Sequence, residues 1–133
     1  MQFMHTIKRS LSLLSLALLV TSCASSPSDQ EIATSFANQR AEMLDSIVPV
    51  NMNGYNLIRA KSISTEIELT LLYSENAQIQ PPTVLANNLN NAYCLDNEIN
   101  SLMQKGVSYR LLFRDARGRA IHQQAISAKT CVN

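Results

Sequence analysis

An alternating segment near the middle of the chain limits the possible folds more than any other feature. From Thr65 to Tyr73, mostly apolar side chains alternate with Glu66, Glu68 and Thr70. A period of two over this length is typical of a strand with one buried and one solvent-facing side. Such strands belong to antiparallel sheets that are covered on one face. The segment therefore predicts a sheet with a single packed layer.

The first predicted helix begins at Ser28 or Asp29 and is about eighteen residues long, ended by Pro49. Arg40 marks the edge of its apolar stripe, and Glu31 lies in the first turn, where negative charge favours the helix. The apolar side chains recur at helical spacing and predict the buried face. They are Ile32, Ala33, Phe36, Ala37, Met43, Leu44 and Ile47.

The rest of the chain adds a partner for the alternating strand, two short helices and a second hairpin. Residues 51–54 predict a turn, 55–62 a strand, 82–92 and 97–104 helices, and 107–113 a strand that returns through a turn at 115–118. The order of helix, hairpin, two helices and hairpin predicts an α+β domain. We expect a mainly antiparallel four- or five-stranded sheet with its helices packed on one face.

The amino-terminal segment has the features of a secretory signal peptide. Lys8 and Arg9 precede a short apolar stretch at 11–20, which is too short for a transmembrane helix of roughly 20 apolar residues. The letters VTSC at 20–23 resemble the lipobox of bacterial lipoproteins, in which the cysteine becomes the acylated N-terminus after cleavage. A plain signal peptide with a chance cysteine at Cys23 is the alternative.

The lipobox resemblance implies a division of the chain and a location. Residues 1–22 would be a lipoprotein signal peptide, 23–28 a lipidated tether and 29–133 a folded domain. Three acyl chains on Cys23 would anchor the protein stably in a lipid bilayer. Ala24, in place of the Asp that retains such proteins in the inner membrane, implies delivery by the lipoprotein sorting machinery to the outer membrane, facing the periplasm.

The two other cysteines, Cys94 and Cys131, predict one disulfide. With Cys23 acylated, they can form only one pair, and the compartment is oxidising. Two free buried thiols are the alternative.

Few residues suggest chemistry. His122 is alone on a predicted strand, and Glu66 and Glu68 lie side by side on a sheet face that we expect to be solvated and opposite Arg110 and Arg114. The chain has a formal charge of +1, which falls to about −1 without residues 1–22, so no nucleic-acid partner is indicated. We expect no catalytic residues, no metal and no cofactor, and therefore a binding protein rather than an enzyme.

Two segments resemble a known family. They are SIVPVNMNGYNLIRAKS, at 46–62, and AYCLDNEINSLMQKGVSYRLLFRDARGRAIHQQAISAKTC, at 92–131. A Pro-Val before a Gly-Tyr strand, a Cys-x-Asp, a Met-x-x-Gly-x-x-Tyr and a terminal Thr-Cys resemble the α/β-type pilotins of bacterial type II secretion systems. The resemblance implies a lipoprotein that binds the C-terminal segment of the secretin, the channel subunit, and promotes its targeting to and assembly in the outer membrane.

Such binding would couple folding of the secretin segment to its insertion in an apolar groove. The expected anchors are Phe36, Leu89, Leu102 and Met103, each of which could equally be a core residue. Two other functions stay open. One is a periplasm-facing lipoprotein of another envelope machine, such as a type III secretion pilot or a pilus-assembly accessory, and the other is an inhibitor-type binding lipoprotein.

Overall fold

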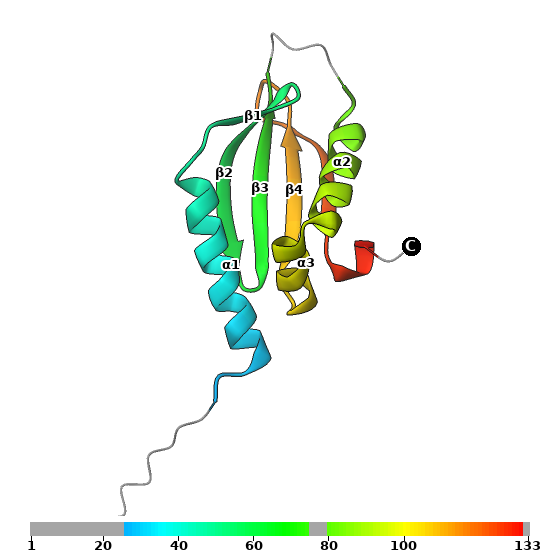
Figure 1. The fold of residues 1–133 in the computed structure, drawn as a ribbon. Coiled ribbons are helices and arrows are strands. Elements are labelled where there is room, and N and C mark those ends of the chain that lie inside the picture. The colour runs from blue at the N-terminus through cyan, green and yellow to red at the C-terminus, as the bar shows by residue number, and fades with distance from the viewer. Residues whose placement is uncertain (1–25, 75–79, 132–133) are drawn as a thin grey trace, which may run out of the picture.

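The predicted sheet is present and has five strands, with three helices on one face (Figure 1). The structure, a computed structural model, describes residues 26–74 and 80–131. The expected signal peptide, the lipobox and residues 75–79 are therefore not described. The elements are α1 (Asp29–Asp45), β1 (Val50–Met52), β2 (Tyr55–Ile63), β3 (Glu66–Tyr73), α2 (Pro82–Leu95), α3 (Asn97–Gln104), β4 (Ser108–Arg114), β5 (Ala120–Ile126) and the short 3-10 helix η1 (Ala128–Cys131).

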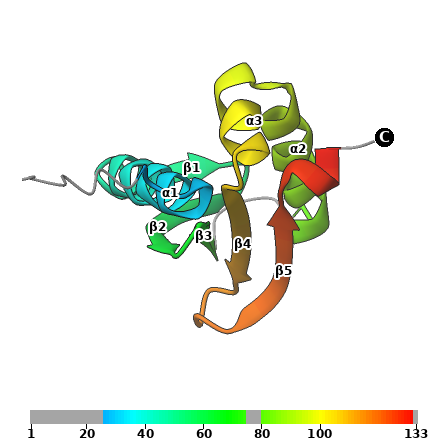
Figure 2. The ribbon, with the colours of Figure 1, turned by 90° about the horizontal axis from the view of Figure 1, so that it is seen from below.

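The strands follow the order β1-β2-β3-β4-β5 across the sheet. Three of the four neighbouring pairs are antiparallel, and β3 and β4 are parallel, with Ile67 opposite Tyr109 and Leu71 opposite Phe113. Helices α2 and α3 connect these two parallel strands and lie on the same face as α1 (Figure 2). The expected mainly antiparallel α+β fold is confirmed, and the parallel pair makes the sheet a mixed one.

The predicted turn at 51–54 is shorter than expected because β1 occupies its first half. Asn51 and Met52 pair with β2, and only Asn53 and Gly54 form the turn. Both have positive φ angles, 49° and 93°, as the two-residue hairpin that matches strand twist requires.

The inward side chains of β3 and β4 form the centre of the core, as the alternation predicted. Ile67, Leu71, Tyr109, Leu111 and Phe113 are fully buried. Removing apolar surface from water in this way is the main stabilising term for a domain of this size.

The outer face of the sheet carries the predicted charges. The Arg110 guanidinium lies 2.7 Å from a Glu66 carboxylate oxygen, whereas Arg114 does not face the glutamates and donates a hydrogen bond to the Gly118 carbonyl.

His122 packs beside Phe113, with ring centroids 5.7 Å apart, which agrees with a packing role.

Helix α1 contacts the sheet through only part of the predicted face: Ala33 and Ala37 are buried as expected, whereas Ile32, Met43 and Ile47 are exposed. Ala33, Ala37 and Ala41 are at most 3% exposed, whereas Ile32 and Met43 are 37% and 49% exposed. Alanine has the smallest side chain that still favours a helix, so this stripe brings α1 close to β2 and β3. The larger apolar side chains are left on the flank of the helix.

The two ends of α1 are held by different hydrogen bonds. Ser28 and Glu31 form a reciprocal capping box at the start. The helix ends at Asp45, before Pro49, and the Asp45 carboxylate accepts a hydrogen bond from the Ala60 backbone N–H at 2.9 Å. That bond ties the end of α1 to β2 next to its irregularity at residues 57–59.

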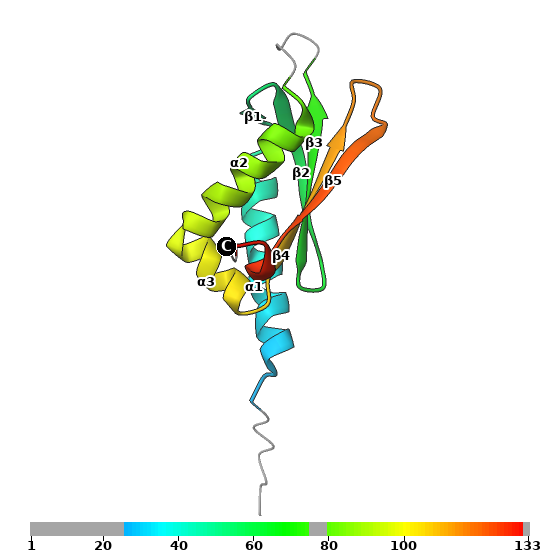
Figure 3. The same cartoon turned by 90° about the vertical axis from the view of Figure 1, so that its right-hand side faces the viewer.

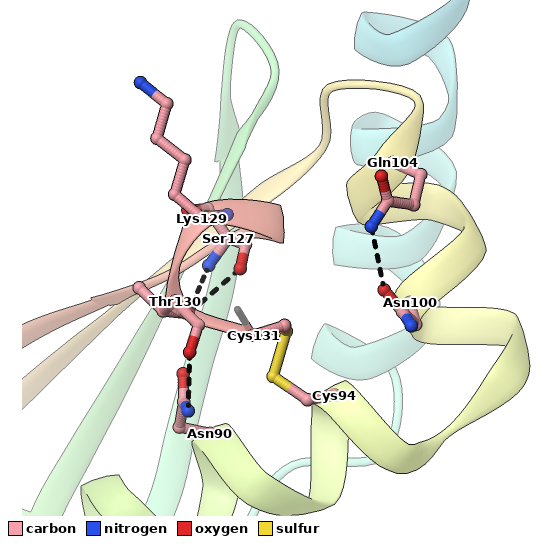
Figure 4. The surroundings of a disulfide bond; sticks show 8 residues. All are labelled: Asn90, Cys94, Asn100, Gln104, Ser127, Lys129, Thr130 and Cys131. Carbon is pink, nitrogen blue, oxygen red and sulfur yellow. Dashed lines mark hydrogen bonds between the residues drawn. A yellow bond between two sulfur atoms is a disulfide. The ribbon is translucent and has the colours of Figure 1, made fainter. Parts of the chain in front are cut away.

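The predicted disulfide is confirmed. Cys94, in the last turn of α2, is bonded to Cys131 in η1 (Figure 4). The Asn90 side chain donates a hydrogen bond to the Thr130 carbonyl, 3.3 Å away, beside the same junction. These links fix the end of the chain to the helix pair that connects β3 with β4.

Candidate functional site

A groove runs between α1 and α3 on the helical side of the molecule, and Figure 3 shows the two helices from the side. It consists of two open recesses of about 500 Å³ and 230 Å³, which share Phe36. We call this feature the α1–α3 groove. Its lining residues are Asp29, Ile32, Phe36, Gln39, Arg40, Met43, Glu98, Leu102, Gln104 and Lys105.

Local sequence signals determine the position of α3, one wall of the groove. The Asp96 side chain caps the helix by accepting a hydrogen bond from the Ile99 backbone N–H at 2.9 Å. The helix ends at Gln104, and Gly106, two residues later, has a φ of +104° that is unfavourable for other residues. The Val107 N–H donates a hydrogen bond to the Leu102 carbonyl. Between these ends, Ile99 and Met103 face the core. Leu102 is only partly buried and faces α1.

Phe36 lies at the centre of the groove. Its ring is partly buried against the core, and the Lys105 ammonium lies 5.2 Å from the ring centroid. This is a cation–π distance, so the end of α3 is tied to the middle of α1 across the groove. The apolar floor around Phe36 is thus bordered by a cation at one end.

A second cation, Arg40, lies deeper in the smaller recess, close to the Tyr93–Tyr109 pair. The two tyrosine rings pack edge to face, with centroids 4.8 Å apart. Burial, followed by the neighbouring Tyr109, raises the pKa of Tyr93 to about 12, although the charge of Arg40 acts in the opposite direction. Burial likewise raises the pKa of Tyr109, and Arg40 partly offsets it. Both hydroxyls therefore stay neutral near pH 7, and the charged side chains of this recess are Arg40 and Glu98.

The structure brings two of the four expected anchors together. Phe36 and Leu102 line the groove from opposite helices. Leu89 and Met103 are 8% and 2% exposed and belong to the core, which removes them from this surface. Met103 follows Leu102 directly, so a rotation of about 100° along the helix separates a wall residue from a core residue.

Sequence reasoning did not place the other eight lining residues in a groove, and four of them matter most for its chemistry. Ile32 and Met43 were expected in the core, Arg40 was expected only at the edge of the apolar stripe, and no sequence feature indicated that Lys105 would lie beside Phe36. Their proximity depends on how α1 and α3 lie on the sheet. No sequence pattern within either helix reports that arrangement.

Within residues 26–74 and 80–131, no group of three or more His, Cys, Asp or Glu side chains is placed to hold a metal ion. No helix in the same residues is long and apolar enough to cross a membrane.

Comparison with known families agrees with the resemblance seen in the sequence. The model of the family described as type II secretion system (T2SS) pilotin, S protein, matches residues 29–131. This chain belongs to the type II secretion pilotin family. The match spans all nine elements, and proteins of this family are chaperone-type lipoproteins associated with the outer membrane, with no catalytic activity indicated.

Solved pilotin structures have the same fold. The pilotin EpsS from the Vibrio vulnificus type 2 secretion system is 23% identical, with a TM-score of 0.73 over 79% of this chain and 96% of that one. The type II secretion pilotin AspS from Vibrio cholerae is 25% identical, with a TM-score of 0.67 over 77% and 95%. A putative secreted protein from Pseudomonas aeruginosa, PA3611, shares the fold at 11% identity and a TM-score of 0.64, over 81% and 100%. No curated protein matches the chain significantly.

Proposed function

We propose that this pilotin binds the C-terminal segment of a type II secretion secretin in the α1–α3 groove. It would do so as an outer-membrane lipoprotein that promotes targeting of the secretin to that membrane and its assembly there. The observation that carries the proposal is an apolar groove, with Phe36 at its centre, on a member of the pilotin family.

The dimensions of the groove suit a short amphipathic helix. From Ile32 to Met43 along α1, the rise of a helix gives a length of about 16 Å, or three turns. Ile32, Phe36, Met43 and Leu102 offer apolar contacts along that length. Side chains at helical spacing on a partner would meet them in the manner of other helix-in-groove complexes.

The proposed lipid anchor would place the groove near the membrane. If Cys23 is the acylated N-terminus, six residues, 23–28, separate it from the start of α1 at Asp29. Even fully extended, they span about 20 Å. Asp29 and Ile32 line the larger recess, so a bound segment would be held close to the bilayer to which the lipoprotein sorting machinery delivers the pilotin.

Titration of the full chain with a peptide of the cognate secretin's C-terminal segment tests the proposal. We expect saturable binding, a gain of helix by circular dichroism and a negative heat-capacity change. In Ile32→Glu, binding should be lost while the fold remains. The matched control is Ile121→Glu, because Ile121 is similarly exposed, at 47%, but lies on β5 and outside the groove lining.

In cells, the groove variant should still reach the outer membrane while secretin multimers accumulate in the inner membrane. Absence of binding at high micromolar peptide by the correctly folded wild type would contradict the proposal. It would favour an inhibitor-type lipoprotein, and binding to a subunit of a different envelope machine would favour a pilot for that machine.

A further inference from the structure

Arg40 is a partly buried cation whose charge has no carboxylate partner among the described residues. Its Nε–H is buried and donates no hydrogen bond within the part of the chain that the structure describes. Within the same residues, no Asp or Glu oxygen lies within ion-pair distance of its guanidinium. Glu98 lines the same recess without forming such a pair.

The Arg40 side chain is partly exposed, so its charge keeps some hydration but is not compensated by a carboxylate of the described residues. A guanidinium removed from water loses hydration, and only a carboxylate with good geometry compensates for it. Elsewhere in the chain such pairs are formed, at 2.7 Å between Arg110 and Glu66 and at 2.8 Å between Arg119 and Asp115. The groove therefore contains an arginine that lies beside the Tyr109 hydroxyl and has no carboxylate partner among the described residues, so its charge is available to an anion.

We propose that Arg40 receives a carboxylate from the bound partner segment, and that this contact selects an acidic side chain at the edge of the partner's apolar face. The inference rests on the proposed function and adds a specificity-determining residue to it. Phe36 and Met43 lie four residues before and three residues after Arg40 on α1, on the same side of the recess. The partner Asp or Glu is therefore flanked by the apolar side chains that contact these two residues.

Glu98 sharpens the inference because its charge has the sign of the expected ligand. A partner carboxylate that reaches Arg40 enters a recess in which Glu98 is already present. Replacing Glu98 by Gln should remove this like-charge repulsion and tighten binding. If Arg40 served only to neutralise Glu98 within the free protein, the same substitution would leave affinity unchanged and lower stability instead.

The experiment measures binding of the full chain to a synthetic peptide of the cognate secretin's C-terminal segment. Arg40→Gln should weaken binding by about ten- to a hundredfold, the usual range for a lost charge-assisted contact. Arg40→Lys should restore only part of it, since an ammonium lacks the planar fork. Arg110→Gln, on the outer sheet face, should bind like the wild type.

The partner side of the contact is tested by changing each Asp and Glu of the peptide to its amide, which leaves the protein unaltered even if an Arg40 variant folds poorly. One substitution should match the loss in Arg40→Gln, and combining the two should add little further loss. Unchanged affinity in Arg40→Gln, or a peptide in which no acidic position couples to Arg40, overturns this inference while the proposed function stands. A folded wild-type chain that does not bind the peptide overturns both.

Discussion

The disulfide provides a prediction whose size follows from the structure. Replacing both Cys94 and Cys131 by Ala removes the bond between α2 and η1 and leaves the buried core intact. The bond joins residues 37 positions apart in the sequence. For a loop of that length, the lost constraint on the unfolded chain amounts to about 4 kcal/mol. A domain of this length has a total stability of only about 5–15 kcal/mol.

The measurement is urea unfolding of the wild type and the double variant, followed by circular dichroism. We expect the free energy of unfolding to fall by about 4 kcal/mol and the thermal midpoint by about 15–30 °C. Asn90→Ala is the matched control, since it removes the hydrogen bond to Thr130 at the same junction without opening the covalent loop. That change should cost only about 1 kcal/mol.

The same variant tests whether the disulfide supports the groove. Cys94 lies two residues before Asp96, the cap of α3, so the bond also fixes the start of one groove wall. At a temperature where the double variant is folded, its affinity for the secretin peptide should be lower than that of the wild type. A double variant no less stable than Asn90→Ala would refute the reasoning from loop length.

Three other results are expected. Ile32→Glu should fold and lose peptide binding. Ala33, the next residue of α1, is 1% exposed, so Ala33→Glu should unfold the domain because it buries an unpaired charge. Similar circular dichroism melts for the two variants would contradict this prediction. The pKa of Tyr93 is raised to about 12, so the neutral side chain should stabilise the fold fully below pH 10. As the pH rises toward 12, the free energy of unfolding should fall by on the order of 2 kcal/mol. Ultraviolet titration checks the pKa, and Tyr93→Phe should lack this part of the pH dependence. Cys23→Ser should yield an uncleaved or soluble form, and the wild type should incorporate labelled fatty acid; its failure to do so would contradict the proposed anchor.

Local patterns predicted most of the elements because their causes are local. The alternation around Ile67 indicates which side of β3 is buried. Asp96 marks the start of α3 because its side chain accepts a backbone hydrogen bond, and Gly106 follows the end because it tolerates a positive φ angle. The parallel pairing of β3 with β4 has no such signal. It depends on where the connection through α2 and α3 returns to the sheet, which is a contact between segments far apart in the sequence.

The groove residues were harder to predict because burial on a helix depends on its rotation. Leu102 and Met103 are both large and apolar, and the sequence offers no reason to place one on a wall and the other in the core. Leu89 has the same ambiguity on α2. The four expected anchors were therefore chosen for their apolar character alone. The structure separates them by the direction in which each side chain points.

The exposure of the large apolar side chains of α1 explains why this small domain has a groove at all. Large apolar side chains would normally turn inward, and the helical periodicity predicted that Ile32, Phe36 and Met43 would do so. The sheet is instead covered by the alanine stripe, which allows α1 to approach it closely. Single exposed apolar side chains are ordinary on protein surfaces. Ile32 and Met43, however, lie in line with Phe36 along a groove that Leu102 lines from the other helix. Because small residues make the contact that holds the helix, the large ones remain available to a partner without loss of the fold.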